Sequence, residues 1–156
     1  MGYHVIEWNS HYSVGIESID EQHKQIISMC NNLCLNCYKK ESFFQDFFRQ
    51  GLSGLFSFLR YHFTAEEQML DSVNFPDILT HKEEHNRYVN FFNGYLSYLG
   101  TDDEKVLKES MPAIQDRLLT HISNYDHGYA NYIHTLKRHG SWYLRDGHLP
   151  TEAFLG

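Results

Sequence analysis

Residues 61–70 read YHFTAEEQML and place His62 and Glu66 four positions apart. On a helix, this spacing puts both side chains on one face. Upstream, Leu55 and Phe58 continue that face at intervals of three and four residues, which is the period of an amphipathic helix. The stretch therefore predicts a helix whose buried face carries an imidazole and a carboxylate among apolar side chains.

Three further segments combine the same apolar period with ionisable residues on the apolar face. They contribute His23, the pair His81 and His85, and the pair His121 and Asp126. We expect helices over about residues 19–39, 42–72, 76–99 and 101–138, with Pro112 splitting the last one. The predicted fold class is all-α, an antiparallel up-and-down four-helix bundle.

The chain ends are expected to flank this bundle. We predict one domain over residues 1–156, with an extended N-terminal arm at 1–18, the bundle at about 19–139 and a short C-terminal tail at about 140–156. The net charge of −7, without a lysine or arginine cluster, argues against a nucleic-acid partner. No secretory signal and no apolar run of membrane-spanning length occurs, so we expect a cytoplasmic protein. A monomer is expected, and its protein partner is unknown.

The ionisable residues on the buried faces require an explanation, because burying unpaired polar groups is unfavourable. Five histidines and two carboxylates would converge in one core. A single zinc ion would use only three or four of them. Seven groups suit two metal ions with bridging carboxylates, and imidazole and carboxylate ligands without thiolate favour iron or manganese.

The motifs GIESIDEQHK, YHFTAEEQML, HKEEH and HISNYD occur in the order and spacing found in hemerythrins. From about Trp8 to about Tyr132, the chain resembles the single-domain bacterial hemerythrins. By this resemblance, one iron is held by His81, His85 and His121, and a second iron by His23 and His62. Glu66 and Asp126 bridge the two irons, along with a solvent-derived oxo or hydroxo group.

The resemblance also implies reversible O2 binding at the open position of the second iron, for storage, delivery or scavenging. The expected pocket is apolar, and its candidate walls are Ile26, Ile27, Leu70 and Leu118. A sensor of O2, nitric oxide or redox state is one alternative. A peroxide or nitric-oxide reductase is a weaker one, since no acid–base pair beyond the ligands is evident, and we do not expect an enzyme.

The fourth predicted helix differs from the family pattern at one residue and from ideal helix geometry at another point. Arg117 stands where the family often places tryptophan, and it either reaches the O2 pocket or points to solvent with its stem over the core. The five positions from His121 to Asp126 correspond to about 140° on an ideal helix. We therefore predict a π-bulge within residues 121–126. His127 is expected to face solvent, with a contact to the site as the alternative.

Two motifs indicate other chemistry if they are read alone. HKEEH fits the H-x-x-E-H pattern of inverted zinc proteases, which would need a distant third ligand, a substrate cleft and a larger chain. Cys30, Cys34 and Cys37 match a three-cysteine cluster spacing, but they continue the apolar face of the first helix. We interpret them as core residues, with redox sensing or an additional metal as the alternatives.

Overall fold

The computed structural model describes residues 5–36, 42–99, 101 and 104–139. Its elements are the 3-10 helix η1 (Ser10–Tyr12), the helices α1 (Glu17–Asn36), α2 (Ser42–Ser72), α3 (Ile78–Leu96) and α4 (Glu104–Thr120), the π-helix η2 (His121–Asp126) and the helix α5 (His127–Arg138). The described residues contain no strand. None of their helices has both the length and the apolar character that crossing a membrane requires.

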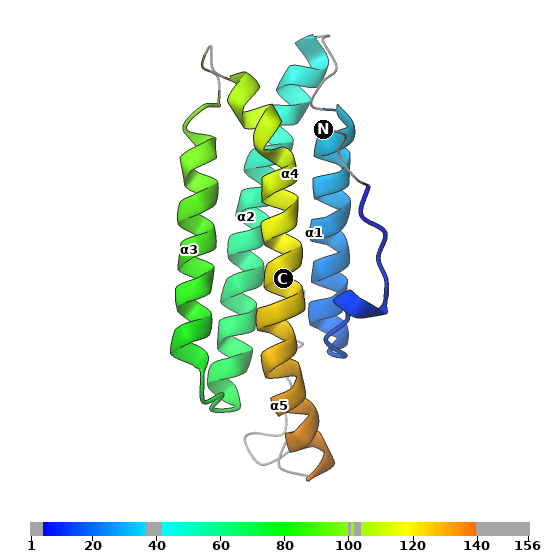
Figure 1. The fold of residues 1–156 in the computed structure, drawn as a ribbon, viewed down its shortest axis with the longest axis vertical. Helices are drawn as coiled ribbons and strands as arrows, with labels where there is room; N and C mark the ends of the chain where they lie inside the picture. Colours follow the sequence, from blue (N-terminus) through cyan, green and yellow to red (C-terminus); the bar gives the residue numbers. More distant parts are fainter. Residues whose placement is uncertain (1–4, 37–41, 100, 102–103, 140–156) are drawn as a thin grey trace, which may run out of the picture.

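The long helices lie side by side as an antiparallel bundle (Figure 1). Helix α1 packs against α2 and α4, and α3 packs against the same two helices, so the four form a closed ring. Helices α4, η2 and α5 follow one another without a break and together form the fourth rod. The predicted all-α four-helix bundle is therefore confirmed.

The predicted bounds of α2 agree with the structure, whereas those of α1, α3 and the fourth rod differ from it by a few residues. Helix α2 has the predicted bounds, α1 begins two residues earlier than expected, and α3 ends at Leu96. The prediction that Pro112 splits the fourth helix is wrong, because α4 runs through it. A proline removes one main-chain hydrogen bond. Here Met111 and Ile114 are buried on either side of it, and their burial favours continuation of the helix.

The predicted end of the first helix at Lys39, Cys37 and the C-terminal tail at about 140–156 lie outside the described residues. The assignment of the whole chain to one domain stays a prediction.

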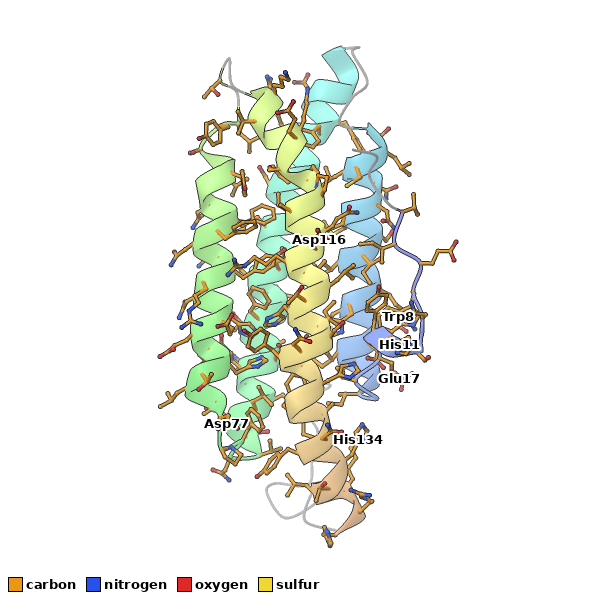
Figure 2. All side chains as sticks on the ribbon, viewed as in Figure 1. Trp8, His11, Glu17, Asp77, Asp116 and His134 are labelled. Atoms are coloured by element: carbon orange, nitrogen blue, oxygen red, sulfur yellow. The ribbon has the colours of Figure 1, made fainter. Side chains whose placement is uncertain are left out.

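Residues 5–16 run along α1 and contain η1, so α1 begins before residue 18, the predicted end of the N-terminal arm. The main chain of this segment is fixed by Asn31, whose side chain accepts from the Ile6 amide at 2.9 Å and donates to the Ile6 carbonyl at 2.8 Å. Lys24 lies over the Trp8 ring, 5.4 Å from its centre. Figure 2 shows Trp8 and His11 together beside α1.

The end of the arm is tied to the last helix. His134 of α5, labelled near the lower end of the bundle in Figure 2, donates Nε2–H to the carbonyl oxygen of Val14 at 2.9 Å. Gly15 follows with a φ of +68°, and a Cβ at this position would lie 2.7 Å from His134 Nε2. Both the backbone conformation and the close approach therefore require glycine.

Two hydrophobic clusters lie along the bundle on either side of its ionisable residues. The larger cluster includes Ile26, Leu59 and Leu118. The smaller cluster includes Ile19, Leu70 and Ile133. Along α1, His23 falls between Ile19 of one cluster and Ile26 of the other, and the ionisable layer is thus apolar above and below.

Candidate metal centre

The structure brings together all seven residues that the sequence analysis proposed as ligands. They form two groups of four, and within each group the ligand atoms lie within 4.8 Å of one another. The first group is Glu66, His81, His85 and His121, and the second is His23, His62, Glu66 and Asp126. Glu66 belongs to both groups. All seven side chains are buried, and the most exposed are His81 and His121 at 4%.

Each carboxylate directs its two oxygens toward different groups. Asp126 places Oδ1 3.1 Å from Nε2 of His121 and Oδ2 3.2 Å from Nε2 of His23. Glu66 places Oε2 3.0 Å from Nε2 of His81 and 3.1 Å from that of His85, while Oε1 lies 4.0 Å from Nε2 of His62. Both carboxylates therefore have the orientation of a bridge between two neighbouring metal positions.

The polar atoms of the site fit metal ligation better than hydrogen bonding. Both ring nitrogens of His23, Nε2 of His121 and both oxygens of Asp126 are buried without a hydrogen-bond partner. Nε2 of His23 and Nε2 of His121 nevertheless lie 3.2 and 3.1 Å from the two Asp126 oxygens. Two ligand atoms at right angles, each about 2.1 Å from a shared metal ion, would be about 3.0 Å apart. The residues present thus fit a pair of metal ions.

The orientation of two imidazoles is fixed from outside the site. Nδ1 of His62 lies 2.8 Å from Oε1 of Gln22, and Nδ1 of His85 lies 2.7 Å from Oε1 of Glu67. Donation from Nδ1–H leaves the Nε2 lone pair directed into the centre, as is usual for histidines that bind metals. Phe63 stacks on the His85 ring at 4.0 Å between ring centres and shields that side from water.

The π-helix predicted from the spacing of His121 and Asp126 is confirmed. Element η2 spans these two residues and joins α4 to α5. Its hydrogen bonds link each residue to the fifth one along, so the two side chains come onto the same side of the rod. The irregular turn is therefore what allows both residues to reach the centre.

Tyr129, one helical turn after Asp126, donates its hydroxyl to Oε1 of Glu66 in a short, buried contact. Burial raises the pKa of the Tyr129 phenol well above its usual value, and the nearby Glu66 and Asp126 carboxylates act in the same direction. The phenol is therefore a permanent donor at neutral pH. It orients the carboxylate that both groups share.

The protonation states match those of metal ligands. Burial lowers the pKa of His62 to about 3, against the opposing effect of Glu66. Burial alone would raise the pKa of Glu66, but His62, His81 and His85 hold it well below its usual value. The pKa of Asp126 is also lowered, by His121 and His23, despite burial and the Glu66 charge. Metal binding requires ionised carboxylates and neutral imidazoles.

One imidazole is shifted in the other direction. Burial would lower the pKa of His121, but the carboxylates of Asp126 and Glu66 outweigh it and raise the pKa above its usual value. In the metal-free protein, the positive charge of His121 therefore balances the negative charge of Asp126 in an ion pair. A metal ion would take over that role.

The candidate walls of the O2 pocket are all buried: Ile26, Ile27, Leu70 and Leu118 are at most 3% exposed. Leu70 belongs to the smaller cluster, and Ile26 and Leu118 belong to the larger one. These three are therefore apolar, buried residues of the clusters that flank the centre, and Ile27 is buried but belongs to neither cluster. The role of all four in holding O2 stays a prediction.

Arg117 is half-buried beside the Phe91 ring, and both positions considered for it from sequence stay predictions. Its guanidinium lies 4.8 Å from the centre of the Phe91 ring and lines a cavity beside His121. None of the four candidate wall residues lines that cavity. His127 is half-buried, and its Nε2 is a buried atom without a hydrogen-bond partner, so the solvent-facing prediction is only partly met.

Cys30 and Cys34 lie in the larger hydrophobic cluster, at 0% and 1% exposure, as the core interpretation predicted. Burial raises the pKa of the Cys30 thiol, and a protonated thiol is a poor nucleophile. Gln22, Glu67 and Tyr129 were missed by the sequence analysis. Gln22 and Glu67 could have been found because each is adjacent in sequence to a predicted ligand. Tyr129 could have been found because it lies about one helical turn after Asp126.

The comparisons with known proteins agree with this geometry. The family model of the hemerythrin HHE cation binding domain matches residues 14–133. A hemerythrin-like protein of Naegleria gruberi is 30% identical over 126 residues, covering 81% of this chain and 92% of its own length. A bacteriohemerythrin of Clostridium acetobutylicum is 23% identical, covering 78% of this chain and 96% of its own length.

The fold is also shared with solved structures. A crystal structure of wild-type hemerythrin superimposes with a TM-score of 0.71 at 20% identity, covering 82% of this chain and 97% of its own. The family match extends over most of the chain and includes every residue of the two ligand groups. The chain therefore belongs to the hemerythrin HHE cation binding domain family.

Proposed function

We propose that this protein binds two iron ions at the centre and binds O2 reversibly there, for storage, delivery or scavenging. The observation that carries the proposal is the pair of buried four-residue groups that share Glu66. The ligands proposed for one iron are His81, His85 and His121, and those for the other are His23 and His62. Glu66 and Asp126 are the proposed bridges.

The unequal number of histidines supports an O2 site at one iron. The second group has one imidazole fewer, which leaves a coordination position for a small molecule. When bound, two ferrous ions would supply the electrons and the open position that reversible O2 binding needs. Ile26, Ile27, Leu70 and Leu118 would exclude water from that position.

A carrier is favoured over an enzyme by the composition of the buried layer. Among the described residues, the buried carboxylates and imidazoles are the seven proposed ligands. Apart from the Tyr129 phenol, which is held protonated, no further buried ionisable group contacts them. The site thus offers ligands without a separate acid–base pair. A sensor would use the same ligands and would differ in binding a partner according to O2.

The test is metal analysis of the purified protein, anaerobic reduction, optical titration with O2 and purging with inert gas. The expected result is two irons per chain and an absorption band that appears with O2 and disappears on purging. Glu66→Gln should lower iron content at both positions, because Glu66 belongs to both groups. Glu83→Gln, at an exposed residue of α3, is the matched control. Irreversible oxidation, or protein without iron, would contradict the proposal.

A further inference from the structure

A cavity of about 250 Å³ lies against the outer side of the candidate centre. It is lined from α3 and from the rod formed by α4 and η2: Glu84, Tyr88, Arg117, Thr120, His121 and Tyr125. Sites for drug-sized ligands are usually about 300–1,000 Å³ in volume. This cavity therefore suits a smaller molecule, and one of its walls is a proposed metal ligand.

The charge of the cavity comes from Arg117. Among the described residues, no carboxylate oxygen lies within 4.0 Å of its guanidinium, which is held over the Phe91 ring instead. Glu84 also lines the cavity, but it is already paired with Arg87 in a short contact. Glu84 therefore has a cationic partner, whereas Arg117 has no carboxylate partner among the described residues and is the group of the lining that can bind an anion.

His121 offers a second donor on the same face. Its Nε2 is directed to Asp126 in the centre, which leaves Nδ1 on the other side of the ring. Nδ1 has no hydrogen-bond partner within the described part of the chain, whereas the corresponding nitrogens of His62 and His85 contact Gln22 and Glu67. Histidines that bind metals normally donate this N–H to a carboxylate, a carbonyl or water.

The two donors are positioned to act together. Arg117 precedes His121 by four residues on one rod, so their side chains lie on the same face. Both line the cavity, as do Tyr125 and Tyr88. Tyr125 stacks on the His121 ring with 5.6 Å between ring centres and an angle of 25°. The lining therefore combines a cation, an imidazole N–H and aromatic surface.

We propose that this cavity binds a small carboxylate with a planar, unsaturated body. One carboxylate oxygen accepts from Nδ1–H of His121, the other accepts from Arg117, and the body packs against Tyr125. Nδ1 of His121 carries a proton when its Nε2 binds a metal ion, so the proposal rests on the proposed function. A carboxylate that accepts from Nδ1–H makes the imidazole a stronger ligand.

The test uses sodium benzoate as the probe, titrated calorimetrically into the purified protein with its metal, at constant ionic strength. Saturable binding at one site per chain is expected. Arg117→Gln should weaken it by about tenfold or more, since a charge-assisted hydrogen bond is lost. Arg60→Gln, at an exposed residue of α2, makes the same charge change away from the cavity and should leave binding unchanged.

Benzamide, which has the same ring without the charge, provides a test that needs no variant and should bind much more weakly than benzoate. Thermal unfolding establishes that the Arg117→Gln protein is folded. Equal benzoate binding by wild type and Arg117→Gln, equal binding of benzamide and benzoate, or no benzoate binding in the millimolar range would overturn the proposal. Iron content measured on the same samples tests the proposed function separately.

Discussion

Replacing Glu67 by alanine should weaken metal binding although Glu67 is not a proposed ligand. Its Oε1 lies 2.7 Å from Nδ1 of His85, and this contact holds the imidazole with Nε2 toward the centre. Loss of such a partner usually lowers metal affinity by about 10–100-fold. The Glu67 side chain is 28% exposed, so water can partly replace it, and we expect the lower end, about tenfold or about 1.4 kcal/mol.

The assay is competition for iron with a chelator of known affinity under anaerobic conditions. Glu83→Ala is the control, because Glu83 is 67% exposed and pairs with Arg87 on the solvent side of α3. The Glu67→Ala effect should also largely disappear in a His85→Ala background, since the two changes remove the same interaction. A full additional loss in that background, or an equal loss in Glu83→Ala, would refute the role assigned to Glu67.

Three further predictions concern stability. The metal-free protein should lose stability as the pH falls below about 6.5, because folding lowers the pKa of His62 to about 3 and the unfolded chain takes up that proton first. Denaturant titrations should show a slope of about 1.4 kcal/mol per pH unit from this group, and a flat profile would contradict the prediction. Tyr129→Phe should leave Glu66 with one donor fewer and destabilise the metal-free protein by about 1–3 kcal/mol in the same titration, whereas an unchanged midpoint would mean that the contact contributes nothing. Gly15→Ala should lower the melting temperature, because its φ of +68° and the approach of His134 both disfavour a Cβ, and an unchanged or raised melting temperature would show that the arm relaxes.

Much of the fold and of the candidate site follows from local sequence patterns. The period of apolar residues located the long helices, and the placement of His62 and Glu66 in that period identified a polar layer in the core. The five-residue step from His121 to Asp126 was enough to predict η2, since the helix geometry allows few other ways to align the two.

What could not be predicted depends on contacts between helices. Glu67 reaches His85 on the next helix, and Gln22 reaches His62, through rotations of the helices about their axes that a periodicity does not specify. Arg117 was ambiguous for the same reason, because its position is set by the Phe91 ring on α3. The prediction at Pro112 was wrong for a different reason. The tendency of proline to break a helix was overridden there by the burial of its neighbours.

The arrangement of polar and apolar layers explains why folding and metal binding should be coupled. Five buried atoms of His23, His121 and Asp126 lack hydrogen-bond partners, and each such atom costs about 1–3 kcal/mol. The apolar clusters on both sides must offset this cost in the metal-free chain, and they also keep water from relieving it. The same burial that disfavours the empty site thus holds the ligands in place for metal ions, so the centre is preorganised at the expense of the stability of the metal-free fold.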